Sequence, residues 1–192
     1  EQVCAAFKLI LKDPNVRARL RAVFGAAGAD DTRLRRYLAE LWGEIGDAEA
    51  EPIMVDAVGR LNELLVRPGG RDGELVEKVT GELIYYLGSL GRLGIDTSEP
   101  TLVGAATDAD AGVRKAAAAA LGDFGRKQVV AGKVPSPALI QALLKLHEDG
   151  DDWVRMNAAL ALAKVGRPEG LPTLQAMLER TWLKSRNLGF PD

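Results

Sequence analysis

The sequence predicts an all-α fold, an α-solenoid (α-α superhelix) of about five stacked helical hairpins. Two observations favour this fold class. The stretch DADAGVRKAAAAALGDFG, from Asp108 to Gly125, is followed forty-one positions later by DGDDWVRMNAALALAKVG, from Asp149 to Gly166, with the same features at the same offsets. Aromatic residues make up only 5% of the 192 residues, while Ala, Leu and Gly are abundant, which favours closely packed helices over a β-sandwich.

Each copy begins with an apolar residue, usually followed by a basic one. Eight positions after Val113 comes the large apolar Leu121, then Gly122, and at the twelfth position Gly125. The other anchors give a large apolar residue, a small residue and a glycine at the same offsets: Leu162, Ala163 and Gly166 after Val154; Trp42, Gly43 and Gly46 after Leu34; Leu87, Gly88 and Gly91 after Val79; and Phe24, Gly25 and Gly28 after Val16. Offsets of about 4, 8 and 11 return to one face of a helix, so each copy predicts an amphipathic helix.

The residues around each copy predict how its helix begins, packs and ends. Aspartates ahead of the anchor, such as Asp13, Asp31, Asp110 and Asp151, are expected to cap the first amides. The small residue after the large apolar one suits a close contact between helices. The final glycine is expected to end the helix, because glycine enters the left-handed conformation without steric cost.

Second helices are expected between the anchors, at about 49–65, 136–148 and 168–184, with a shorter one in SEPTLVGAATD. The resulting hairpins cover approximately 1–28, 30–67, 72–108, 109–148 and 149–185, within a single repeat domain over 1–192. Each hairpin buries its apolar stripe only when the next is stacked on it. The chain starts at Glu1 with the apolar stretch EQVCAAFKLILK, so we expect a fragment of a longer protein that exposes an apolar patch at this end.

This pattern resembles HEAT repeats, and more narrowly the short HEAT-like repeats of phycobilisome lyase subunits. The framework D-x-x-V-R-x-x-A-A-x-A-L-x-x-x-G at 110–125 and 151–166 carries the resemblance, with looser copies at 31–46 and 76–91. The resemblance implies an armadillo-like helical architecture. It does not imply one function, because the family includes scaffolds, adaptors, lyases and nucleic-acid enzymes.

Several classes of site are disfavoured by composition. The net charge of −2 gives no general attraction to nucleic acid or anionic membranes, and no apolar run of about 18 residues exists to span a bilayer. Cys4 and His147 are the only cysteine and histidine, too few for a zinc site of the usual kind. No phosphate-binding or nucleophile-elbow motif is present. We therefore expect no catalytic residues, no metal and no cofactor.

The arginines and tryptophans are the remaining candidates. Arg35, Arg114 and Arg155, with Arg17, suggest an anion-binding ladder, but an aspartate four residues before Arg35, Arg114 and Arg155 favours a structural ion pair or cap. Trp42 is expected in the core, because it occupies the large apolar offset. Trp153 is expected to be partly exposed and to contact a partner, and Trp182 to close the core or meet a further repeat.

We expect a non-catalytic scaffold or adaptor that binds a protein through the concave face of the solenoid. Candidate partner-binding residues fall off the apolar stripes of the second helices, together with the exposed tryptophan: Asp56, Arg60, Glu63, Gln141, Lys145, Trp153, Gln175 and Glu179. Two alternatives stay open. The resemblance allows a bilin lyase-type subunit, and it allows a nucleic-acid binder, although the slightly acidic balance makes nucleic acid an unfavoured partner. The sequence does not identify the protein partner or the oligomeric state.

Overall fold

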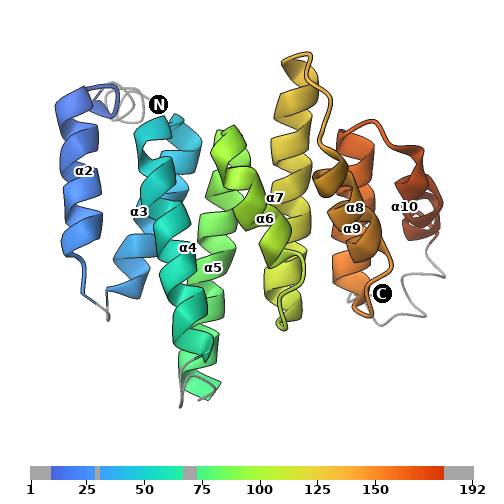
Figure 1. Ribbon diagram of the computed structural model, residues 1–192, viewed down its shortest axis with the longest axis horizontal. Helices are drawn as coiled ribbons and strands as arrows, with labels where there is room; N and C mark the ends of the chain where they lie inside the picture. The colour runs from blue at the N-terminus through green and yellow to red at the C-terminus, as the bar shows by residue number, and fades with distance from the viewer. Residues whose placement is uncertain (1–9, 29–30, 67–72, 180–192) are drawn as a thin grey trace. The chain divides into compact units, whose positions relative to one another are not determined.

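A computed structural model describes residues 10–28, 31–66 and 73–179, which form helices joined by turns and contain no strand (Figure 1). The chain divides into two compact units, unit 1 over residues 1–93 and unit 2 over residues 94–192. The predicted all-α class is confirmed. The single domain over 1–192 and its five hairpin boundaries stay predictions, and Cys4, Trp182 and the expected N-terminal patch around EQVCAAFKL lie outside the described residues.

Unit 1 holds α2 (Pro14–Ala26), α3 (Thr32–Ile45), a short 3-10 turn (Ala48–Ala50), α4 (Glu51–Val66) and α5 (Gly73–Leu93). Helix α5 packs against both α3 and α4, and α2 packs against α3. The Trp42 side chain is fully buried, and its ring centroid lies 5.0 Å from that of Phe24. This aromatic contact joins α2 to the core that α3 and α5 form, as expected for Trp42.

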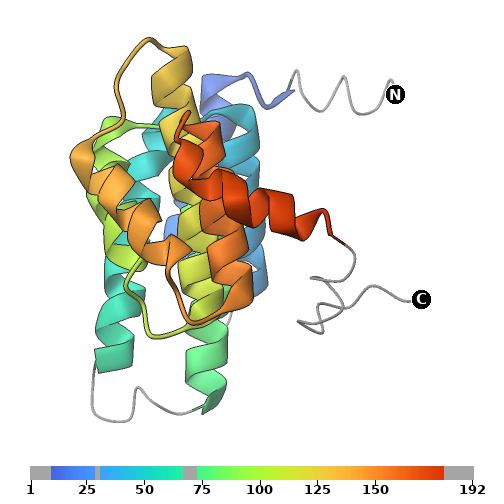
Figure 2. The same ribbon diagram turned by 90° about the vertical axis from the view of Figure 1, so that its right-hand side faces the viewer.

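Unit 2 holds a 3-10 turn (Asp96–Ser98), α6 (Glu99–Ala105), α7 (Ala111–Val130), α8 (Pro137–His147), α9 (Asp152–Lys164), a second 3-10 turn (Pro168–Gly170) and α10 (Leu171–Met177). Helix α7 packs along α9, and α8 and α10 also pack against α9. Figure 2 shows α8 and α9 side by side, with α10 in front of them. The helices of the two repeat copies, α7 and α9, which we call first helices, therefore stack on each other. They carry the second helices α8 and α10 beside them, which is the arrangement of an α-solenoid within this unit.

The two sequence copies form similar helices because equivalent residues have the same structural roles. Asp110 and Asp151 occupy the N-cap positions of α7 and α9, and each side chain accepts a hydrogen bond from the amide three residues on, at 3.0 Å. Val113 and Val154 are buried in the following turn. The predicted caps are confirmed here and at Asp13, but Asp31 turns its carboxylate back to the Gly28 amide instead of capping α3.

The glycines at the ends of the copies differ in their roles. Gly46 and Gly166 have φ values of 68° and 76° and follow α3 and α9, as predicted for helix stops. The prediction was wrong at Gly91 and Gly125, because α5 continues to Leu93 and α7 to Val130. A Cβ atom at Gly125 would lie 2.4 Å from the Val165 side chain, so this glycine permits close packing on α9 instead.

The expected second helices at 49–65 and 136–148 correspond to α4 and α8. The one expected at 168–184 is shorter than predicted, since α10 ends at Met177. The amides of Leu178 and Glu179 donate to carbonyls three residues back, at 3.0 Å each, and this tight turn closes the helix. Over the residues that the structure describes, no helix has the length and apolarity needed to cross a membrane.

Candidate functional site

Helix α4 presents three of the predicted partner-binding residues to solvent. Asp56, Arg60 and Glu63 are all exposed, while Met54, on another side of the helix, is fully buried. Spacings of four and three residues place the exposed three on one face. Arg60 donates from Nη1 to Asp56 at 2.9 Å, with both side chains more than 60% exposed. This pair is weakly held, because exposed ion pairs contribute only about 0–1 kcal/mol.

Helices α8 and α10 present the corresponding residues of unit 2. Gln141 and Lys145 are exposed and lie four residues apart on α8, and Gln175 is exposed on α10. Nε2 of His147, in the last turn of α8, lies 2.8 Å from the Thr173 hydroxyl on α10. The single histidine is therefore at a helix C-terminus, as expected, where it links two second helices.

Two predicted residues of unit 2 do not lie on its second helices. Trp153 is 45% exposed, as expected, but it lies in the first turn of α9, a first helix, and not on the second helices. Leu160, seven residues on, is also 45% exposed. Glu179 is exposed but follows the end of α10, so its placement on the second helix was wrong.

The repeated arginines hold the fold together. Arg114 donates from Nε and Nη2 to the carboxylate of Asp149 at 2.7 and 2.9 Å, and from Nη1 to the Asp108 carbonyl at 2.9 Å. Arg155 donates to the Asp149 carbonyl and pairs with Asp152. Asp110 and Asp151, which stand four residues before these arginines, cap their helices. The arginines form their ion pairs with Asp149 and Asp152 instead. The geometry therefore favours a structural role for these arginines over an anion-binding ladder.

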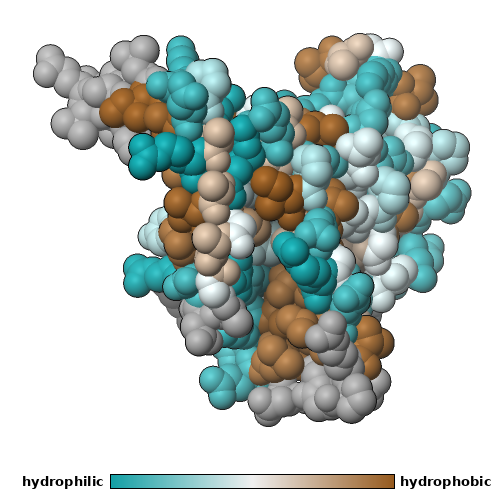
Figure 3. Space-filling model, turned by 60° about the vertical axis from the view of Figure 1, so that its left-hand side comes forward, coloured by the Kyte–Doolittle hydropathy of each residue, from teal (hydrophilic) through white to brown (hydrophobic). Residues whose placement is uncertain are grey.

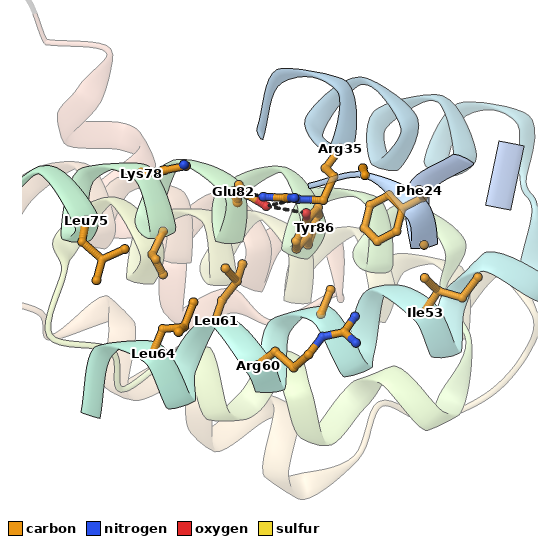
Figure 4. Close-up of a pocket in the computed structure, with 14 residues that line it drawn as sticks. Phe24, Arg35, Ile53, Arg60, Leu61, Leu64, Leu75, Lys78, Glu82 and Tyr86 are labelled. Atoms are coloured by element: carbon orange, nitrogen blue, oxygen red, sulfur yellow. Dashed lines mark hydrogen bonds and ion pairs between the residues drawn. The ribbon is translucent and has the colours of Figure 1, made fainter. Parts of the chain in front are cut away.

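Unit 1 contains a pocket of about 400 Å³, which we name the α2–α5 pocket. Its walls come from the end of α2, the start of α3 and the facing sides of α4 and α5. The lining residues are Phe24, Gly25, Ala27, Arg35, Ile53, Ala57, Arg60, Leu61, Leu64, Leu75, Lys78, Val79, Glu82 and Tyr86. Figure 4 shows Leu61 and Leu64 on α4 facing the residues of α5 across this space. Figure 3, which brings the α2 side forward, shows brown apolar surface between hydrophilic surfaces.

A buried polar network forms one wall of the α2–α5 pocket. Arg35 donates from Nε and Nη2 to the two oxygens of Glu82, at 3.0 and 2.7 Å, and the Tyr86 hydroxyl donates to the same carboxylate at 2.6 Å (Figure 4). The Glu82 side chain is only 2% exposed. A buried carboxylate is tolerated here because three donors satisfy it.

The network shifts the pKa values of its members. Burial by itself would raise the pKa of Glu82, but the hydrogen bonds from Arg35 and Tyr86 outweigh burial and hold that pKa below its usual value. The hydrogen bond to Glu82 raises the pKa of Arg35. Burial, followed by the hydrogen bond to Glu82, raises the pKa of Tyr86. At neutral pH the network is therefore an ion pair closed by a neutral phenol.

Sequence reasoning missed Glu82 and Tyr86. They stand four residues apart on α5, a visible helical spacing, but the partner Arg35 lies 47 residues from Glu82. The pocket was missed for the same reason, since its walls come from four helices. In the described part of the chain, no group of three or more metal-ligating side chains gathers.

Comparison with known proteins points to the same helical-repeat architecture. Residues 129–186, under a third of the chain, match the family model for HEAT repeats. No curated protein matches. HEAT repeats generally serve as interaction scaffolds between proteins and are generally non-catalytic. The narrower phycobilisome-lyase type stays a prediction. Residues 129–186 of unit 2 are therefore similar to HEAT repeats.

Proposed function

We propose that this chain is a non-catalytic scaffold or adaptor that binds a protein partner through the exposed face of its second helices. The observation that carries the proposal is the two-sided character of α4 and α8. On α8, Leu139, Leu143 and Leu146 are buried against the unit, while Gln141 and Lys145 are exposed. On α4, the same division separates Met54 from Asp56.

The exposed surface of the second helices in each unit suits a protein partner of mixed polarity. In unit 1, α4 offers carboxylate and guanidinium groups, and in unit 2, α8 and α10 offer amide and ammonium groups; side chains on rigid helices lose little order on binding. Polar rims of this kind give specificity more than affinity. The candidate residues are Asp56, Arg60 and Glu63 in unit 1, and Gln141, Lys145 and Gln175 in unit 2.

The test uses the full chain as bait, with a photo-crosslinking residue placed at Gln141 or, as the matched control, at Lys115. Lys115 is exposed on α7, a first helix. We expect a stoichiometric protein partner to crosslink at position 141 and not at position 115. We also expect Lys145→Ala to weaken its capture, whereas Lys115→Ala leaves it unchanged.

Other outcomes overturn specific parts of the proposal. A partner that depends on Trp153 and not on Lys145 would move the interface to the first helices. An eluate that absorbs visible light, with no protein partner, would favour the bilin lyase-type alternative. Retention of nucleic acid that falls steeply with added salt would favour the nucleic-acid alternative.

A further inference from the structure

We propose that the α2–α5 pocket binds a small uncharged molecule with an apolar body, of the class that includes medium-chain alcohols and fused aromatic rings. The pocket lies within unit 1 and takes a small molecule in place of a protein. The proposal therefore goes beyond the scaffold function, and either can fail without the other. Three features of the pocket carry it: the size, the apolar walls and the pairing of the charged side chains in the lining.

The pocket has the size and depth of a small-molecule site. Its volume of about 400 Å³ lies within the range of about 300–1,000 Å³ that is typical of such sites. Part of its wall is buried, since Val79 and the Glu82 side chain are each only 2% exposed. The Arg60 side chain, also in the lining, is 64% exposed. The pocket therefore reaches from the interior of unit 1 to the solvent, and a ligand has a route of entry beside Arg60.

Apolar side chains from α2, α4 and α5 make most of the wall. Nine of the fourteen lining residues are apolar or glycine. Leu64 and Leu75 lie toward one end of the pocket, and Phe24 and Ile53 lie toward the other (Figure 4). An elongated apolar body fits between these ends. Its removal from water supplies the affinity, at about 25 cal/mol for each Å² of apolar surface buried.

Each charged side chain in the described lining already has a partner. Arg35 and Glu82 pair with each other at 2.7 Å. Arg60 pairs with Asp56 at 2.9 Å, and Lys78 has an interaction of its own. A charged ligand would therefore lose its hydration without gaining a free opposite charge. The lining favours an uncharged ligand over an anion and over a cation.

The buried polar network is also occupied by its own hydrogen bonds. Arg35 donates from Nε and Nη2 to Glu82 and from Nη1 to the Gly28 carbonyl. The Tyr86 hydroxyl donates its proton to Glu82. A polar group of a ligand gains little from donors that are already used in this way. The apolar body of the ligand, and not a polar group, is therefore the part that the pocket recognises.

Two glycines provide a matched pair of variants. A Cβ atom at either Gly25 or Gly59 would meet nothing within 4 Å, and both lie within helices, α2 and α4. Gly25 lines the pocket and Gly59 does not. Gly25→Leu therefore places a side chain at the wall of the pocket, whereas Gly59→Leu adds the same side chain elsewhere on the surface. Both changes favour helix, so both variants should fold.

The experiment is a fluorescence titration of the full chain with N-phenyl-1-naphthylamine, an uncharged probe that brightens in apolar surroundings. We expect saturable binding at one site per chain. Gly25→Leu should lower the affinity for the probe by about tenfold or more, a loss of about 1.4 kcal/mol, while Gly59→Leu leaves it unchanged. Far-ultraviolet circular dichroism establishes that each variant is folded.

Displacement of the bound probe tests the preference for an uncharged ligand. Decanol, decanoate and decylamine have chains of equal length and differ in charge. We expect decanol to displace the probe at a concentration about tenfold lower than either ion requires, because neither ion meets a free opposite charge in the lining.

Three results would overturn the proposal. The first is the absence of saturable probe binding to the unaltered chain, including the case in which only a peptide with apolar side chains binds. The second is displacement by decanoate or decylamine at concentrations as low as decanol requires, because the pocket would then accommodate a charge. The third is equal loss of affinity in Gly25→Leu and Gly59→Leu, which would place the probe outside the α2–α5 pocket.

Discussion

We expect Gly122→Ala to destabilise unit 2, although alanine is the better helix former. Gly122 lies within α7, where an added Cβ would be 2.7 Å from Cβ and 2.8 Å from Cα of Ala161 on α9. Ordinary contacts begin at 3.4 Å, so the two helices would have to separate by roughly 0.7 Å. Cα belongs to the backbone and cannot rotate away as a side chain can.

The magnitude follows from two opposing effects. Adding a methyl group to a well-packed contact costs about 1–3 kcal/mol. Replacing glycine by alanine within a helix returns about 1 kcal/mol. The net loss for Gly122→Ala is therefore about 1 kcal/mol, which lowers a urea midpoint by about 0.4 M for a typical small-protein denaturant slope.

The assay is urea denaturation followed by far-ultraviolet circular dichroism, with Gly104→Ala as the control. Gly104 lies in α6 of the same unit, is exposed, and has nothing within 4 Å of an added Cβ, so alanine should raise stability there. The two substitutions are chemically identical and should have opposite signs. If Gly122→Ala raises the midpoint as Gly104→Ala does, the close-contact explanation of the repeat's small residue is wrong.

Three further predictions concern the polar groups. Glu82→Gln should destabilise unit 1 by about 2 kcal/mol at neutral pH. Because the folded pKa of Glu82 is lowered from its usual value of 4.5, the difference in stability between the variant and the original protein should narrow as the pH falls below 4.5 and through the folded pKa; a difference independent of pH would contradict this. Arg114→Gln and Asp149→Asn, combined in a double-mutant cycle, should show a coupling of about 1 kcal/mol that decreases in high salt, whereas additive effects would argue against the ion pair. Asp151→Ala should cost about 1 kcal/mol in thermal or urea denaturation because the Val154 amide loses its cap, and Asp151→Asn should restore most of it.

The beginning and the end of a helix were predictable where they depend on residues that are close together in the sequence. The caps at Asp110 and Asp151 follow from side chains acting on amides three residues away. The different ends of α7 and α9 also had a local signal. Gly166 is followed by Arg167 and Pro168, and proline disfavours further helix, whereas no proline follows Gly125 until the segment has passed Val130.

The α2–α5 pocket was not predictable in this way, because it depends on the lengths and register of different helices. The α3–α5 offset is fixed by one contact, Arg35 to Glu82, between residues that are far apart in the chain. Pattern reasoning identifies a helix face but not which neighbour covers which part of it. Helix α3 begins three residues before Arg35 and α5 begins nine residues before Glu82. This six-residue difference leaves no trace in the repeat, although the pocket lies beside it.

The arginine that follows the apolar anchor of the repeat connects each helix to the loop that precedes it. Arg17, Arg114 and Arg155 each donate to a carbonyl six residues earlier, before the start of their own helix. For Arg114 and Arg155, such a bond fixes the direction in which the chain enters the helix, and hence the angle between that helix and the one before it. Arg114 adds a bond to Asp149, at the start of the next copy, which ties the same geometry to the following hairpin. The conformation of the loop is therefore part of the repeating unit, because it sets how each hairpin lies on the next.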